Sequence, residues 1–239
     1  LCNGEVLPRA PEVATLIEFT HRATSGIALL LVVGLVVWTW RTRPAGDRLR
    51  FWVAASAALM ISEALLGAGL VLFRLVAHDA SSARAFAMIA HLINTFALLA
   101  ALALSARWAR HPAAPRGEGR GPLPVLMIVA LVGLVLIATT GAVAALGNTL
   151  FPVRTLAEGL QQDFSPTSHF LLRLRVLHPI LGVGVGVLVA VLAALTAFRS
   201  GAQHVLMLAG VVLSLVILQV FCGFANLLLL APVWLQLVH

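Results

Sequence analysis

The sequence predicts an all-α integral membrane protein. Its 239 residues are 61% hydrophobic and 10% charged, with a mean hydropathy of +1.02, whereas soluble domains are about 45–50% apolar and about 25% charged. Apolar runs of the length that a membrane helix needs, about 20 residues, recur along the chain. They lack the alternation over about ten residues that marks the strands of a membrane barrel.

Six segments have full span length, and a seventh begins near Pro232 and stops at His239. The six are 17–40, 52–76, 85–108, 123–146, 172–198 and 204–230. Glycines cluster within 182–186, and we expect them to allow neighbouring helices to approach closely. Cys222 lies within a span and is expected to be a small core residue.

Arginines set the predicted orientation, and they account for the net charge of +7 because the chain has no lysine. They gather in the loops after the first, third and fifth spans, as Arg41, Arg43, Arg48, Arg50, Arg107, Arg110, Arg116, Arg120 and Arg199. The positive-inside rule places these loops in the cytoplasm, so the charge does not indicate nucleic-acid binding. Segments 1–16, 77–84 and 147–171 then face outward. We expect the inner (plasma) membrane of a prokaryote.

Four histidines lie at similar depth in the outer half of the predicted spans: His21, His91, His178 and His239. Neighbouring spans run in opposite directions, so random placement would scatter them. Ionisable groups inside a membrane usually serve a function, and imidazole is a common axial ligand of haem. The pattern predicts haem ligation. The alternative for His21 is an interfacial histidine whose ring reaches toward the membrane surface. For His91 and His178 it is a buried histidine bonded to a nearby hydroxyl or carbonyl.

Glu18 precedes His21 by three residues, so both share one face of a helix. The carboxylate could accept a proton beside a haem. The alternative is a helix-start carboxylate that the helix dipole favours.

A weak internal repeat relates the two halves of the chain. Segment 21–41 runs from a histidine through a Leu/Val-rich helix to an arginine, and 178–199 does the same. Each is followed by a helix with a central glycine, Gly67 or Gly223, and then by a segment with another histidine. The repeat predicts two pseudo-symmetric four-helix bundles in tandem. We place them at 1–110 and 111–239.

Taken together, the chain resembles the haem A synthase (CtaA/Cox15) family along nearly its whole length. Any one matching piece is weak, but their order and spacing are specific. The pieces are Leu1-Cys2-Asn3-Gly4 with Pro8, Glu18-Phe-Thr-His21-Arg22, His91 in Ala-His-Leu-Ile-Asn, 141–152, 157–159, 174–179, 219–223 and Pro232 through His239.

The resemblance implies eight helices in two four-helix halves. In the N-terminal half it implies a site for the substrate haem O, with His21 and His91 on the iron and Glu18 as the essential carboxylate. In the C-terminal half it implies a haem B site with His178 and His239 as axial ligands. The implied reaction is an oxidation: two hydroxylations of one methyl group give a geminal diol, which loses water to leave the formyl group of haem A.

The chain departs from the family pattern at both ends. The first helix is absent, only the second of a cysteine pair is present, as Cys2, and the last helix stops at His239. We therefore expect a fragment of a longer protein. Whether Cys2 has a disulfide partner is left open.

Other polar residues have two interpretations each. Arg22, Arg173 and Arg175 could pair with haem propionates, because a guanidinium matches a carboxylate, or they could be ordinary interface anchors. Glu63 lies mid-span, and it is either a proton-path residue or a protonated carboxyl bonded to a neighbour.

The alternative function is a non-enzymatic dihaem cytochrome b that passes electrons between a quinol and a partner complex. Such a carrier needs the four histidines but not Glu18. A transporter is disfavoured because the spans lack paired interior charges. For the enzyme, the expected partners are membrane lipid and an electron donor or acceptor that the sequence does not identify. Haem O synthase and a second copy of the chain are left open as further partners.

Overall fold

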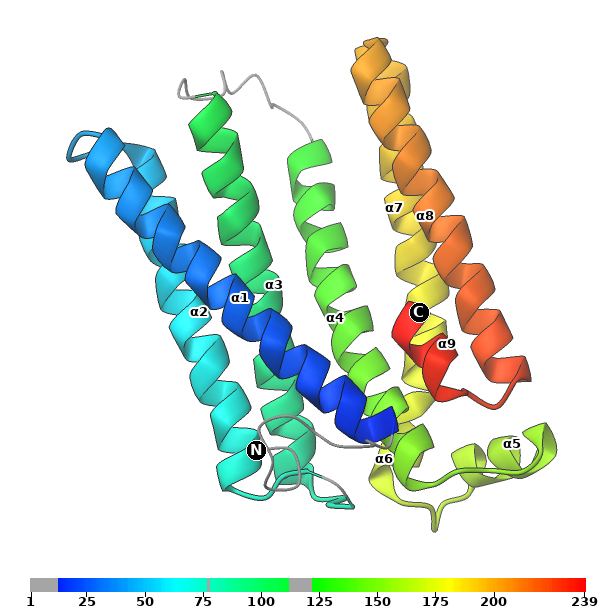
Figure 1. Ribbon diagram of the computed structural model, residues 1–239. Helices are drawn as coiled ribbons and strands as arrows, with labels where there is room; N and C mark the ends of the chain where they lie inside the picture. Colours follow the sequence, from blue (N-terminus) through cyan, green and yellow to red (C-terminus); the bar gives the residue numbers. More distant parts are fainter. Residues whose placement is uncertain (1–12, 77, 112–121) are drawn as a thin grey trace. The chain divides into compact units, whose positions relative to one another are not determined.

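The structure is a computed structural model, and it describes residues 13–76, 78–111 and 122–239. Every regular element in these ranges is a helix (Figure 1). The helices are α1 (Val13–Thr42), α2 (Arg48–Leu72), α3 (Ser82–Arg110), α4 (Leu123–Leu150), α5 (Leu156–Phe164), α6 (Phe170–Arg175), α7 (Leu177–Ser200), α8 (Gln203–Leu228) and α9 (Val233–Val238). The Leu1–Gly4 motif, Cys2, Pro8, Arg116 and Arg120 lie outside the described residues.

Six stretches are long and apolar enough to cross a membrane, and they coincide with the six predicted spans. Five of them are single helices, and the sixth, Phe170–Ser200, joins α6 to α7. Many large apolar side chains on these helices are exposed, as expected for helices whose outer surfaces face lipid. The all-helical membrane fold is thus confirmed, and the chain is an integral membrane protein.

The chain divides into two compact units. The first comprises Leu1–Ala68 and Asn94–Pro115, and the second comprises Gly69–Ile93 and Arg116–His239. In the first unit, α1, α2 and α3 meet through the buried side chains of Val32, Met60 and Leu98. The predicted pseudo-symmetry of the two halves stays a prediction.

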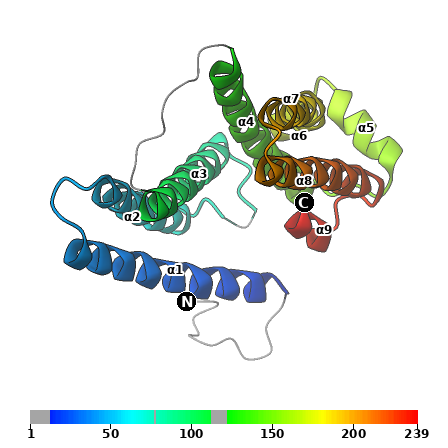
Figure 2. The ribbon, with the colours of Figure 1, turned by 90° about the horizontal axis from the view of Figure 1, so that it is seen from above.

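The second unit is built around α4. This helix packs against α6 and α7, α7 packs against α8, and the short helix α5 contacts α6 (Figure 2). Leu171 is fully buried in a cluster with Val143 and Leu146. At Gly133 an added Cβ would lie 2.8 Å from a methyl group of Val185, so the glycine allows α4 and α7 to approach closely.

A tight turn reverses the chain between α8 and α9. Leu230 and Ala231 both have positive φ, 58° and 54°, a left-handed conformation that is uncommon for residues with a Cβ. Pro232 follows and precedes the first residue of α9. The turn sends α9 back alongside α8 (Figure 1), and this return positions the last residue, His239.

Candidate functional site

His178, the second residue of α7, rests against Gly141 of α4. A Cβ added at Gly141 would lie 2.9 Å from the ring Cε1 and 3.2 Å from Nδ1. Real Cβ atoms essentially never approach another heavy atom to less than 3.0 Å, because the atoms would overlap. The absence of a side chain at Gly141 therefore makes the space that the imidazole fills.

The imidazole of His178 is also oriented by the backbone of α4. Its Nδ1 lies 3.1 Å from the carbonyl oxygen of Ile137 and 3.4 Å from the hydroxyl of Thr140. A carbonyl only accepts, so this contact requires the proton on Nδ1. Nε2 is then the nitrogen with a free lone pair, which is the form of histidine that ligates a metal.

His239 also rests against a glycine, but on a different helix. A Cβ added at Gly223 of α8 would lie 3.1 Å from the Cε1 of His239 and 3.4 Å from its Nε2. Both histidines of the predicted C-terminal pair therefore lie against a glycine of a neighbouring helix. Neither glycine was singled out for this role by the sequence.

The two imidazoles face one another. Their ring centres are 5.9 Å apart, and the ring planes are inclined by 77°. An imidazole nitrogen binds a transition metal at about 2 Å, so two rings on opposite sides of one metal ion have centres roughly 6 Å apart. The spacing of His178 and His239 therefore fits a shared axial pair on one haem iron.

The predicted residues of the N-terminal site fall into both compact units. Glu18, His21 and Arg22 are exposed on α1 in the first unit, whereas His91 is half-buried on α3 within the part assigned to the second. Glu18 forms an ion pair with Arg22, one helical turn further on, and both side chains are largely exposed. The pairing of His21 with His91 on one iron stays a prediction.

Glu63 is held between α2 and α3 by a polar network. One carboxylate oxygen accepts a hydrogen bond from Asn94 Nδ2 at 2.6 Å, and the other accepts from the hydroxyl of Thr95. Asn94 in turn donates to the carbonyl of Leu59 at 2.9 Å and accepts from the hydroxyl of Ser62. The carboxyl group is therefore hydrogen-bonded to its neighbours, and a role in proton transfer stays open.

Arg175, the last residue of α6, connects α6 to α4 and α5 in the second unit. Its Nη1 donates to Asn148 Oδ1 of α4 at 2.9 Å, its Nη2 donates to the carbonyl of Gly159 in α5 at 3.1 Å, and its Nε pairs with Asp163. The side chain is only 10% exposed. A haem propionate could therefore reach this guanidinium only by replacing one of these contacts.

The network around Arg175 includes a helix in segment 147–171 that was not predicted from the sequence. This segment contains helix α5, which begins after Thr155, whose hydroxyl accepts from the backbone N–H of Glu158 at 3.2 Å. Thr155 with Glu158 is a helix-start signature that could have revealed it. No sequence pattern indicated that the guanidinium of Arg175 is bonded on all sides, because its partners Asn148, Gly159 and Asp163 are distant in sequence.

The chain is similar to known membrane proteins along its length. The profile of one family, described as COX15-CtaA, cytochrome oxidase assembly protein, matches residues 9–239. A Thermus thermophilus protein named Protoheme IX farnesyltransferase is 44% identical over 238 residues, which is 100% of this chain and 39% of that protein.

Shorter matches come from proteins named Heme A synthase. The protein from Shouchella clausii is 41% identical over 73 residues, 30% of this chain and 24% of its own length. The protein from Alkalihalophilus pseudofirmus is 37% identical over 73 residues, 30% of this chain and 25% of its own length. No solved structure matches. The chain thus spans well under half of the length of these curated relatives.

Proposed function

Because the chain belongs to the COX15-CtaA family of cytochrome oxidase assembly proteins, we propose that it acts as a haem A synthase. It would oxidise a methyl group of haem O to the formyl group of haem A. The observation that carries the proposal is the pair His178 and His239, whose ring centres lie 5.9 Å apart. The same chain has Glu18 three residues before a third histidine, His21. The names of the shorter relatives support it.

We assign His178 and His239 to haem B. These two imidazoles would hold the haem, and a haem held by two histidines would supply electron transfer. The chain's own contribution is to fix the ligands. Gly141 and Gly223 make room for the two rings, and the Ile137 carbonyl holds the proton of His178 on Nδ1.

We assign His21 and His91 to the substrate haem O, with Glu18 as the group that accepts a proton during oxidation of the methyl group. Arg22 holds the Glu18 carboxylate by an ion pair along α1. Arg22 is a proposed partner of a haem propionate, because a guanidinium offers two parallel donors to a carboxylate. Arg175 is a second proposed partner, and it would release one of its contacts with Asn148, Gly159 or Asp163 to pair with a propionate.

The name of the Thermus thermophilus relative suggests how the substrate is supplied. A transferase that adds a farnesyl group to protohaem IX makes a farnesylated haem, the kind of molecule that the proposed reaction consumes. We therefore propose haem O synthase as a partner. Membrane lipid, an electron donor or acceptor, and a second copy of the chain complete the proposed partners. The proposed location is the inner membrane of a prokaryote, with the haem sites toward the outer face.

The proposal is tested by the haems that the protein carries. The full chain is purified from cells that make haem O, and its haems are extracted and identified by mass. We expect haem B together with haem O, its hydroxylated form or haem A. Cells that cannot make haem O serve as the control, and protein from them should carry haem B only. Haem B alone from both kinds of cell would contradict the proposal and favour the dihaem electron carrier.

A further inference from the structure

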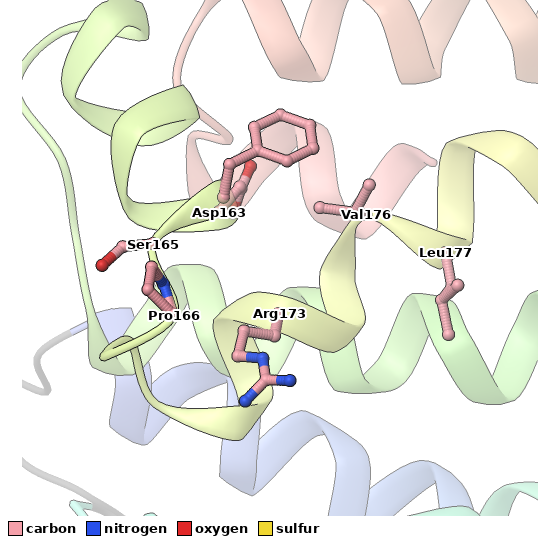
Figure 3. Close-up of a pocket in the computed structure, with 7 residues that line it drawn as sticks. Asp163, Ser165, Pro166, Arg173, Val176 and Leu177 are labelled. Atoms are coloured by element: carbon pink, nitrogen blue, oxygen red, sulfur yellow. The ribbon is translucent and has the colours of Figure 1, made fainter.

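A pocket lies where α5, α6 and α7 meet, within the second unit. It has a volume of about 360 Å³ and is lined by Asp163, Phe164, Ser165, Pro166, Arg173, Val176 and Leu177. In Figure 3, Ser165 and Pro166 lie on one side, Val176 and Leu177 lie on the other, and Arg173 lies between them. The wall is mostly apolar, and Arg173 is the cation among the lining residues.

The charge in this pocket is positive. The carboxylate of Asp163 is neutralised by its ion pair with Arg175. Arg173, by contrast, is exposed, and no ion pair joins it to another side chain in the part of the chain that the structure describes. A guanidinium on an apolar wall favours an anionic group that is attached to an apolar body.

The pocket is distinct from the histidine pair. Leu177 lines the pocket, whereas His178, the next residue, turns toward Gly141 of α4. Neighbouring residues on a helix point about 100° apart, because a turn holds about 3.6 residues. The two sites therefore use different faces of α7.

The pocket lies at the start of the span Phe170–Ser200, and the start of a span is where we expect lipid head groups. Beside it, α5 presents Leu156, Leu160 and Phe164 at helical spacing, and all three are exposed, with Phe164 at 71%. A short helix with an exposed apolar stripe is typical of one that rests in the membrane interface. Arg175 ties α5 to the protein through the carbonyl of Gly159 and the carboxylate of Asp163.

We propose that this pocket binds the head group of an anionic phospholipid. Arg173 pairs with the lipid phosphate, and the acyl chains lie along Phe164, Val176 and Leu177. Each basic residue near a membrane surface contributes about 1 kcal/mol of attraction to anionic lipid, and desolvation in a pocket increases it. The site does not depend on the proposed haem chemistry.

The test compares lipid retention by the purified full chain in neutral detergent, measured by native mass spectrometry with phosphatidylglycerol as the probe. Arg173→Gln should weaken retention about fivefold or more, whereas Arg173→Lys should largely preserve it. Arg199→Gln is the matched control, because Arg199 is an exposed arginine near the other end of the same span, Phe170–Ser200. Phosphatidylcholine should not compete with the probe.

Each contrary outcome overturns the proposal. Equal retention by Arg173→Gln and the unmodified chain would remove Arg173 from the site. An equal loss of lipid retention in Arg199→Gln would show that non-specific surface charge holds the lipid. Displacement of the lipid by inorganic phosphate at equal concentration would identify a free-anion site instead. Retention that occurs only in the haem-depleted variant His178→Ala would assign Arg173 to a haem propionate that excludes the lipid.

Discussion

The imidazole of His178 occupies the space that a side chain at Gly141 would take, with 2.9 Å between the ring Cε1 and the position of an added Cβ. The relationship couples the proposed haem ligand on α7 to a backbone position on α4. It leads directly to a mutational test of the proposed C-terminal haem site.

Gly141→Ala should displace His178 and reduce haem binding in the C-terminal half. Overpacking of this kind lowers the free energy of unfolding by about 1–3 kcal/mol. The measurement is the low-spin haem spectrum together with haem content per chain. Gly182→Ala in α7 is the control, because an added Cβ there has nothing within 4 Å. An unchanged spectrum in Gly141→Ala would show that His178 is not held as proposed.

Removal of either facing histidine should affect one haem only. In His178→Ala and in His239→Ala we expect loss of the bis-imidazole spectrum of haem B, while the other site keeps its ligands. His204→Ala serves as the control, since His204 is an exposed residue at the start of α8. Spectra and haem analysis distinguish the two sites, and loss of both haems at once would argue against separate ligand sets.

Glu18→Gln should preserve haem binding and strongly reduce formation of haem A. The substitution keeps the size and hydrogen-bonding capacity of the side chain but removes the proton acceptor. Loss of a general base typically slows a reaction about 10²–10⁴-fold. The readout is haem A formed per bound haem O. Glu158→Gln, at the start of α5, controls for the loss of a carboxylate near a helix start. An unmodified rate would reduce Glu18 to a helix-end residue.

Glu63→Leu should weaken the contact between α2 and α3. The change leaves the donors of Asn94 and Thr95 without their carboxylate acceptor, which costs about 1–3 kcal/mol of unfolding free energy. Glu63→Gln retains part of the network, and a single hydrogen bond between membrane helices is worth about 0.6 kcal/mol. Unfolding titrations in mixed micelles would measure both. Equal stability of both variants and the unmodified chain would mean that the network contributes nothing.

Arg175→Gln should release α5 from the second unit. The substitution removes the ion pair with Asp163 and the contact with the Gly159 carbonyl, so segment 156–164 should be cleaved faster by protease in detergent. Arg175→Lys restores the charge but not the three-way geometry, and we expect an intermediate rate. Arg173→Gln should leave the cleavage rate unchanged. Protection that persists without Arg175 would show that other contacts hold α5.

The spans could be predicted from the sequence because the length and apolarity of a segment determine whether it can cross a bilayer. The burial of Cys222 was also predicted correctly. The glycine prediction was partly wrong: an added Cβ at Gly182 or Gly184 would meet nothing within 4 Å. Close approaches occur instead at Gly133, Gly141 and Gly223.

The difference has a physical reason. Whether a glycine faces a neighbour depends on the rotation of its helix, and these helices are apolar nearly all round, so the sequence has no polar face to fix that rotation. The histidines could be singled out because a polar group in an apolar span is costly. Their partners, the Ile137 carbonyl and the two glycines, have no side-chain polarity by which to recognise them.

The acceptor for His178 Nδ1 is a main-chain carbonyl, and this has a consequence for how the chain can vary. A hydrogen bond to the far nitrogen of an imidazole increases its electron donation to a bound metal, so it would lower the reduction potential of the haem. Substitution at position 137 changes the side chain but leaves the oxygen in place. Any residue at position 137 that keeps α4 helical would preserve the reduction potential of the proposed haem. Gly141→Pro would change it, because a proline clashes with the carbonyl four residues before it, here that of Ile137.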